Sequence, residues 1–128
     1  MRVLLDTHAL LWWLSGDAKL SDVARSTISD DRNDVFVSAA SAWEVATKHR
    51  IGKLPKVGAL AVDFAHEIRA QGFAPLAITI EHAQTAGALV TDHRDPFDRM
   101  LIAQAREERL ALVSIESIFD QFDITRIW

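Results

Sequence analysis

The stretch VLLDTHALLW, residues 3–12, decides the fold that the sequence predicts. Its apolar run from Val3 to Leu5 is typical of a short buried strand, and residues 7–14 carry leucines at helical spacing. A single acid, Asp6, stands between these two elements. Because open α/β sheets bind ligands beyond the carboxyl ends of their parallel strands, Asp6 is the first candidate functional residue, with a simple helix cap as the alternative.

The same alternation of short apolar runs and helical stretches continues along the chain. Further strands are expected at 35–37, 76–78, 110–113 and 124–128, and helices at 21–29, 38–50, 57–68, 80–89 and 96–108, with Gly72 ending the third of these helices. Such alternation implies right-handed crossovers and a parallel sheet with helices on both faces. We therefore expect a single α/β domain over residues 1–128 with four to five strands.

Composition narrows the class of protein. The chain is 49% hydrophobic and 25% charged, as in ordinary globular domains, and no apolar run approaches the roughly 18 residues of a membrane span. Without cysteines or a signal-peptide pattern, the expected location is cytoplasmic, with no membrane partner. A net charge of −4 argues against nucleic-acid binding by bulk electrostatics, unless bound cations reverse the local sign.

Several acids are expected at one rim of this sheet, at strand ends or in the first turns of the helices that follow. They are Asp6, Glu44, Asp95, Asp98 and Glu116, with Ser114 beside the last. Carboxylate oxygens suit Mg²⁺ or Mn²⁺, and gathered acids repel one another unless a cation is present. Such a metal site favours phosphodiester hydrolysis, because a bound ion makes a nucleophile of water without a side-chain nucleophile.

Each acid also has a purely structural interpretation. Ser41-Ala42-Trp43-Glu44 fits a capping box, in which the Glu44 side chain would bond back to the start of a helix. Asp95 precedes Pro96 as an N-cap would, and Asp98 occupies the third helical position, where acids favour the helix dipole.

Three stretches together resemble the PIN-domain proteins, specifically the VapC-type toxins of toxin-antitoxin pairs. They are VLLDTHALLW at 3–12, VSAASAWE at 37–44 and HRDPFDRMLIAQA at 93–105. The resemblance implies a three-layer α/β/α sandwich and a Mg²⁺- or Mn²⁺-dependent endoribonuclease that cleaves single-stranded RNA. It also implies a cognate VapB-type antitoxin as partner.

The resemblance assigns the site residues one by one. The metal-binding and catalytic acids of the family fall on Asp6, Glu44 and Asp98, with Asp95 as a neighbour in the same motif. Ser114-Ile115-Glu116 stands where the family usually has Thr-x-Asp, so Glu116 is the expected fourth catalytic acid although its side chain is one methylene longer. Ser114 and Thr7 are expected in supporting roles.

The remaining binding surface is predicted from charge and aromatic residues. Lys48, Arg50 and Lys53 lie in a segment without acids and are candidates for binding RNA phosphates, although cations also favour a helix C-terminus. Trp12 and Trp13 are consecutive, so a helix should not turn both toward the same core. One of them is expected at a homodimer or antitoxin interface, where tryptophan is enriched.

Two other α/β classes are excluded by single positions. A phosphoacceptor receiver domain needs an acid after the third strand, where Thr79 stands, and a phosphatase with an Asp-x-Asp pair fails because His8 replaces the second acid. Two related alternatives stay open. One is a housekeeping PIN nuclease that processes RNA without an antitoxin, and the other is a catalytically silent PIN binding module, against which the joint presence of the acids argues.

Overall fold

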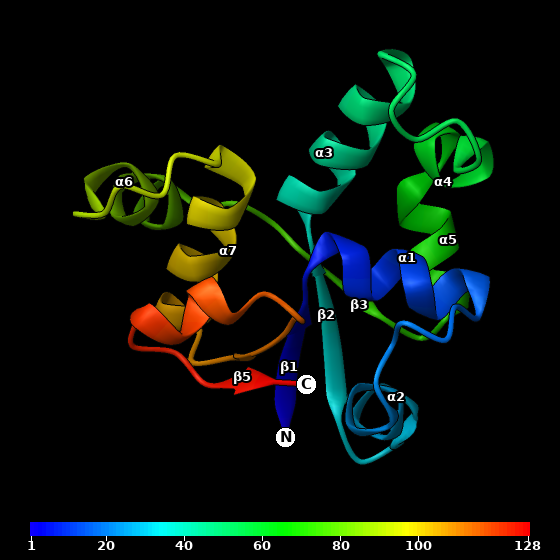
Figure 1. Cartoon of the computed structure of the whole chain (residues 1–128), viewed down its shortest axis with the longest axis horizontal. Coiled ribbons are helices and arrows are strands. Elements are labelled where there is room, and N and C mark those ends of the chain that lie inside the picture. Colours follow the sequence, from blue (N-terminus) through cyan, green and yellow to red (C-terminus); the bar gives the residue numbers. More distant parts are fainter.

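The computed structural model describes all residues from Met1 to Trp128. Its centre is a five-stranded sheet in the order β3-β2-β1-β4-β5, in which every neighbouring pair of strands is parallel. The strands are β1 (Arg2–Leu5), β2 (Asp34–Ser38), β3 (Ala74–Leu76), β4 (Ala111–Val113) and β5 (Arg126–Ile127). The predicted parallel sheet is confirmed, and the N-terminal strand lies at its middle (Figure 1).

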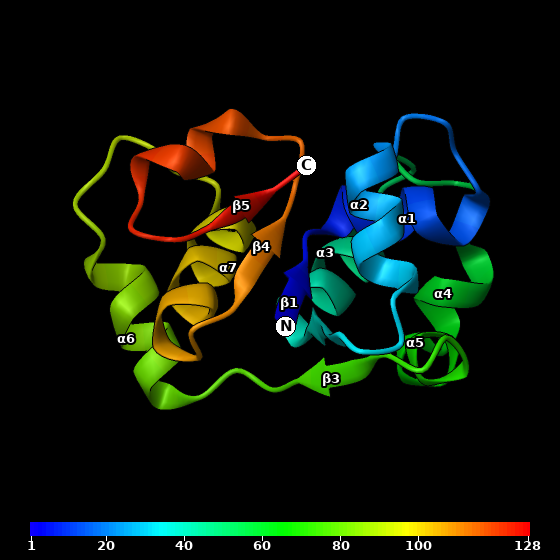
Figure 2. The ribbon, with the colours of Figure 1, turned by 90° about the horizontal axis from the view of Figure 1, so that it is seen from below.

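Helices cover both faces of this sheet. They are α1 (Thr7–Ser15), α2 (Asp22–Ser29), α3 (Ala39–Arg50), α4 (Gly58–Val62), α5 (Phe64–Ala70), α6 (Ile80–Ala88) and α7 (Pro96–Glu107), with the 3-10 helix η1 (Ser117–Gln121). Seen from below, α1, α2 and α5 lie on one side of β1, and α6 and α7 lie on the other (Figure 2). The expected three-layer arrangement is therefore present.

The pleat of β1 explains the two layers of core. Val3 and Leu5 point into an apolar cluster with α1, α2 and α5, while Leu4 points into a second cluster with α7 and Phe119 of η1. Successive strand residues face opposite sides, so a strand buried on both faces must be apolar throughout. Val3, Leu4 and Leu5 are fully buried, which fixes the start of α1 relative to the sheet.

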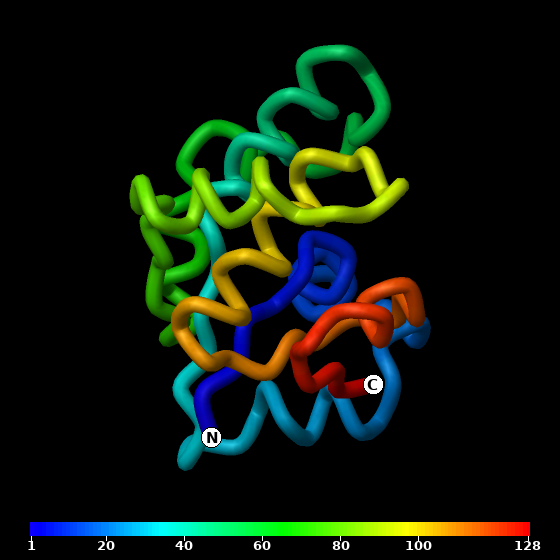
Figure 3. The backbone as a smooth tube through the Cα atoms, turned by 90° about the vertical axis from the view of Figure 1, so that its left-hand side faces the viewer, coloured from blue at the N-terminus to red at the C-terminus, as the bar shows by residue number.

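The strands share one direction, and their carboxyl ends point toward α3. The backbone trace places α3 and the turn after it at the end of the molecule away from the N-terminus (Figure 3). Residues that directly follow β1 and β2, and the first turns of α3 and α7, therefore meet at this rim. No helix in the structure combines the length and the apolar character that crossing a bilayer requires.

Several predicted boundaries are wrong. The expected helix at 57–68 is two helices, because Asp63 leaves helical geometry at φ −140° and ψ 72° and its side chain caps α5 by accepting from the His66 N–H. The apolar spacing runs on across the break, which hides it in the sequence. The third strand lies at Ala74–Leu76 instead of 76–78, because its pairing with β2 runs from Phe36 with Ala74 to Ser38 with Leu76.

The expectation that Trp12 and Trp13 cannot both face the same core is wrong, whereas a place for one of them at a partner interface stays a prediction. Trp12 packs against Trp128, and Trp13 packs against Phe73 while its indole N–H donates to Gln71. Both tryptophans contact the same apolar cluster, because that core is bordered by the last strand on one side and by Phe73 on the other. The exposed tryptophan is instead Trp43 on α3, with 61% of its surface accessible.

Candidate active site

Asp6 lies at the rim directly after β1 and is only 5% exposed. Its Oδ1 accepts from the Ala9 N–H at 2.8 Å and so caps α1, which means that the cap and the position at the rim belong to the same side chain. The pKa of Asp6 is raised to about 6, mainly by burial and to a lesser extent by the charge of Asp98. Hydrogen bonds from Ser114 and Ala9 and the charge of His8 act in the opposite direction.

Glu44 reaches the rim from α3 and is 6% exposed. Its Oε1 accepts from the Thr7 hydroxyl at 2.6 Å, and its Oε2 pairs with the ammonium group of Lys48. The capping-box interpretation is wrong, because α3 is capped by Ser38 and already contains Ser41 within its first turn. Glu44 therefore connects α3 to α1, and not to the start of its own helix.

Asp98 comes from the first turn of α7. Asp95 caps this helix by accepting from the N–H groups of Phe97 and Asp98 at 2.9 and 3.1 Å, which confirms the N-cap prediction. The Nε2 of His93 lies 2.8 Å from Oδ2 of Asp98. Partial burial raises the pKa of Asp98, the charges of Asp95 and Glu44 raise it further, and His93 lowers it.

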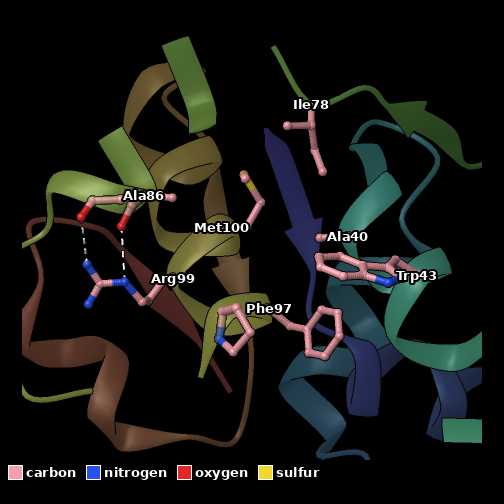
Figure 4. A pocket seen from close by; sticks show the side chains of 9 residues that line it. Ala40, Trp43, Ile78, Ala86, Phe97, Arg99 and Met100 are labelled. Atoms are coloured by element: carbon pink, nitrogen blue, oxygen red, sulfur yellow. Dashed lines mark hydrogen bonds between the residues drawn. The ribbon is translucent and has the colours of Figure 1, made fainter. Parts of the chain in front are cut away.

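Arg99, which the sequence prediction missed, holds the loop that leads into α7. Its guanidinium donates to the backbone carbonyls of Ala86, Leu89 and His93 at 3.0, 2.8 and 3.0 Å. Figure 4 shows the side chain turned from α7 toward the end of α6. Because one of the bonds holds the His93 carbonyl, the same clamp sets where the His93 ring meets Asp98. Nothing in the local sequence marks these bonds, since their acceptors are backbone atoms.

The three carboxylates thus come from three separate elements and act on one another. The charge of Asp98 raises the pKa of Asp6, and the charge of Glu44 raises that of Asp98. Glu116 does not join them: it is exposed, and only its backbone N–H is held, by the Ser114 hydroxyl at 3.0 Å. Ser114 itself is buried, and its hydroxyl lowers the pKa of Asp6.

Asp6, Glu44 and Asp98 offer only carboxylate oxygens to a divalent cation. As the side chains stand, no three of the His, Asp and Glu residues could together hold a metal ion. The carboxylate oxygens instead have protein partners, namely Thr7, Lys48 and His93. Hard oxygen donors with mutually repelling charges nevertheless match what Mg²⁺ or Mn²⁺ prefers. The donor set fits such an ion in chemistry and charge, provided that these oxygens exchange partners.

A cavity of about 250 Å³ opens beside Glu44. It is lined by Thr7, His8, Leu11, Glu44, Lys48, Lys53 and Leu54. Two of the three predicted RNA-binding cations therefore face this cavity, whereas Arg50 is exposed elsewhere on the last turn of α3. Lys48 and Arg50 also satisfy the alternative prediction, since both lie in the C-terminal turn of that helix.

A second, apolar cavity of about 200 Å³ lies between α3 and α7 (Figure 4). The rings of Trp43 and Phe97 form its wall with centroids 5.0 Å apart and planes at 73°. These two residues directly precede Glu44 and Asp98, so the aromatic wall flanks the acids. Met100 and Ile78 are among the other apolar residues of its lining.

Comparison with known proteins agrees with this architecture. A profile of the PIN domain matches residues 3–124. Ribonuclease VapC16 of Mycobacterium tuberculosis is 42% identical over 62 residues, which is 48% of this chain and 43% of that protein. The match thus spans less than half the length of this relative.

Three solved structures share the fold at low sequence identity. VapBC2 from Rickettsia felis, bound to a DNA fragment from its promoter, has a TM-score of 0.64 at 12% identity over 98% of this chain and 97% of that one. VapBC-1 from nontypeable Haemophilus influenzae has a TM-score of 0.65 at 12% identity, over 98% of this chain and 96% of that one. A toxin-antitoxin complex from Klebsiella pneumoniae has a TM-score of 0.60 at 19% identity, over 90% of this chain and 87% of that one.

Proposed function

The chain belongs to the PIN-domain family, and on that premise we propose that it is a metal-dependent endoribonuclease that cleaves single-stranded RNA. The observation that carries the proposal is the meeting of Asp6, Glu44 and Asp98 at the carboxyl ends of the strands, where burial raises the pKa of Asp6 and Asp98 and neighbouring carboxylate charges add to the rise. The similarity to a protein named as a ribonuclease supports the choice of RNA over DNA.

Asp6, Glu44 and Asp98 would hold Mg²⁺ or Mn²⁺. A bound ion supplies a water of lowered pKa and neutralises charge on the in-line transition state of phosphodiester hydrolysis. The chain's own part is to present the oxygens in fixed directions. The backbone N–H of Ala9 holds one Asp6 oxygen, the Thr7 hydroxyl holds one Glu44 oxygen, and the His93 ring holds one Asp98 oxygen.

The remaining site residues have supporting roles in this proposal. Ser114 favours the charged form of Asp6, and Asp95 keeps α7 capped so that Asp98 faces the rim. Glu116 stays a proposed fourth acid that acts through water, because it is exposed and lies beyond the bonded acids. Lys48, Lys53 and Arg50 are proposed to contact RNA phosphates.

We further propose that the enzyme is the toxin of a toxin-antitoxin pair, with a VapB-type antitoxin and a second copy of the chain as partners. The support is its likeness in fold to three structures described as VapBC or toxin-antitoxin complexes. The exposed ring of Trp43 offers a protein partner an aromatic anchor of the kind that interfaces favour.

A cleavage assay tests the activity. The purified chain should cut a single-stranded RNA with Mg²⁺ or Mn²⁺ but not with EDTA, and Asp6→Asn should leave no measurable cleavage although it folds. Cleavage that survives EDTA, or a fully active folded Asp6→Asn variant, would overturn the site. Expression alone should slow growth, and co-expression of an adjacent small reading frame should restore it. Harmless expression of an RNA-cleaving protein would favour the housekeeping nuclease.

A further inference from the structure

Lys48 stands between the acids and the cavity beside Glu44. Its ammonium group pairs with Oε2 of Glu44 four residues earlier on α3, while Oε1 is held by Thr7. The Lys48 side chain is 32% exposed, so it is open to solvent on its cavity side. Both carboxylate oxygens of Glu44 therefore have a partner. Of the two partners, only Lys48 is mobile. A lysine has a flexible stem with a compact charge, which allows it to change partners.

A cation that binds Glu44 competes with Lys48 for the same oxygen. Two cations close to one carboxylate repel each other, so binding of the ion weakens the Lys48–Glu44 pair. The cavity next to Lys48 holds no other acid among its lining residues, but it holds a second lysine, Lys53, and His8. An ammonium group released from Glu44 thus joins a cationic cavity that can accept an anion.

The ligand that fits this cavity is a phosphate group. Lysines bind phosphate as point charges, and the cavity of about 250 Å³ opens directly beside the proposed cleavage site. Thr7 adds a hydroxyl at the same wall. In a single RNA strand, the phosphate next to the cleaved bond lies one nucleotide away, so a neighbouring site of this chemistry would hold the strand in place.

We propose that this cavity is a subsite for an RNA backbone phosphate beside the cleaved bond, and that Lys48 moves from Glu44 to this phosphate when a divalent cation binds the acids. The inference rests on the proposed function, because it names how that site holds its substrate. Binding of the metal and of RNA then reinforce each other, and linkage requires the effect to be equal in both directions. A lysine that only stabilises α3 through its pair four residues away would produce no such coupling.

Metal binding gives the first test. Calorimetry with Mn²⁺ and without RNA would compare the wild type with Lys48→Met, Lys53→Met and the exposed-charge control Arg69→Met. We expect Lys48→Met to bind Mn²⁺ about 2- to 10-fold more tightly, because a competing cation is removed from Glu44. Lys53→Met should change Mn²⁺ affinity less than Lys48→Met does, because Lys53 does not pair with Glu44, and the control Arg69→Met should match the wild type. Weaker or unchanged Mn²⁺ binding by a folded Lys48→Met variant would overturn the exchange.

RNA binding gives the second test. Fluorescence anisotropy of a short single-stranded RNA would be measured in EDTA and in Ca²⁺, with gels to check that the RNA stays intact. In EDTA, Lys48→Met should equal the wild type, because Lys48 is held by Glu44. In Ca²⁺ it should bind about 3- to 10-fold more weakly, with a salt slope smaller by about 0.7, whereas Lys53→Met should be weaker in both conditions. Lys48→Arg keeps the charge and should restore the Ca²⁺-dependent gain.

The outcomes separate this inference from the proposed function. An equal loss of RNA affinity in EDTA and Ca²⁺ would make Lys48 a fixed phosphate contact and overturn the exchange. No loss in either condition would overturn the subsite. If the wild type shows the coupling but never cleaves RNA, the subsite stands and the proposed activity fails. If the wild type cleaves RNA without the coupling, only the exchange fails.

Discussion

Replacing Asp6 by Asn should remove the proposed nuclease activity and at the same time stabilise the protein at neutral pH. Asn is nearly the same size, and its carbonyl oxygen can still accept the Ala9 N–H as an N-cap. The exchange therefore removes a buried negative charge with little change in packing.

The size of the effect follows from the pKa of Asp6. The pKa is raised from 3.8 to about 6, so the folded protein holds the proton more tightly than the unfolded chain does. Stability is then greatest below about pH 4, falls as the pH rises toward 6, and is constant above it. The shift corresponds to about 3 kcal/mol of lost stability at pH 7.5 in the wild type. The Asp6→Asn variant does not show this loss of stability.

Urea unfolding in EDTA would measure this difference in stability between the wild type and Asp6→Asn. We expect Asp6→Asn to raise the free energy of unfolding by about 1 to 3 kcal/mol at pH 7.5, and the gain to disappear near pH 4. Asp31→Asn, at an exposed acid, serves as the control for loss of one charge and should show no such pH dependence. A less stable Asp6→Asn variant at pH 7.5, or a gain that persists unchanged to pH 4, would refute the reasoning.

Three further exchanges probe the rest of the site. Asp98→Asn should abolish RNA cleavage while Asp95→Asn keeps measurable initial rates, because Asn still caps α7; the opposite ranking would reverse their roles. Glu116→Gln should lower cleavage or Mn²⁺ affinity about 10- to 100-fold in a metal titration, and complete loss would make it a direct ligand. Arg99→Met should lower the free energy of unfolding in urea by about 2 kcal/mol, because several backbone carbonyls lose their donor. The exposed Arg106→Met serves as the control, and an equal effect of the two substitutions would refute the clamp.

Sequence reasoning predicted best what local rules decide. The run from Val3 to Leu5 is apolar on both faces, which only a central strand of a covered parallel sheet requires, and the structure confirms it. Asp95 before Pro96 is likewise an N-cap, because the capping acid and the proline in the first turn both indicate that the helix starts there.

Local rules failed where tertiary contacts decide. Ser41 to Glu44 has the letters of a capping box, but the partner of Glu44 is Thr7, 37 residues away, and the helix starts earlier. The break at Asp63 is invisible in the apolar spacing, because the same face continues from α4 into α5. Arg99 was missed because it bonds to backbone carbonyls, which no residue pattern records.

The three acids stand at positions 6, 44 and 98 along the chain, and this order has a consequence for synthesis. A ribosome releases β1, then α3, and only later α7, so the growing polypeptide holds Asp6 and Glu44 without Asp98 while the residues between positions 44 and 98 are made. The rim closes only when α7 packs against the sheet through Leu101, Ile102 and Ala105. The site therefore forms only after α7 has been synthesised, and incomplete or truncated copies that stop before α7 carry no complete site.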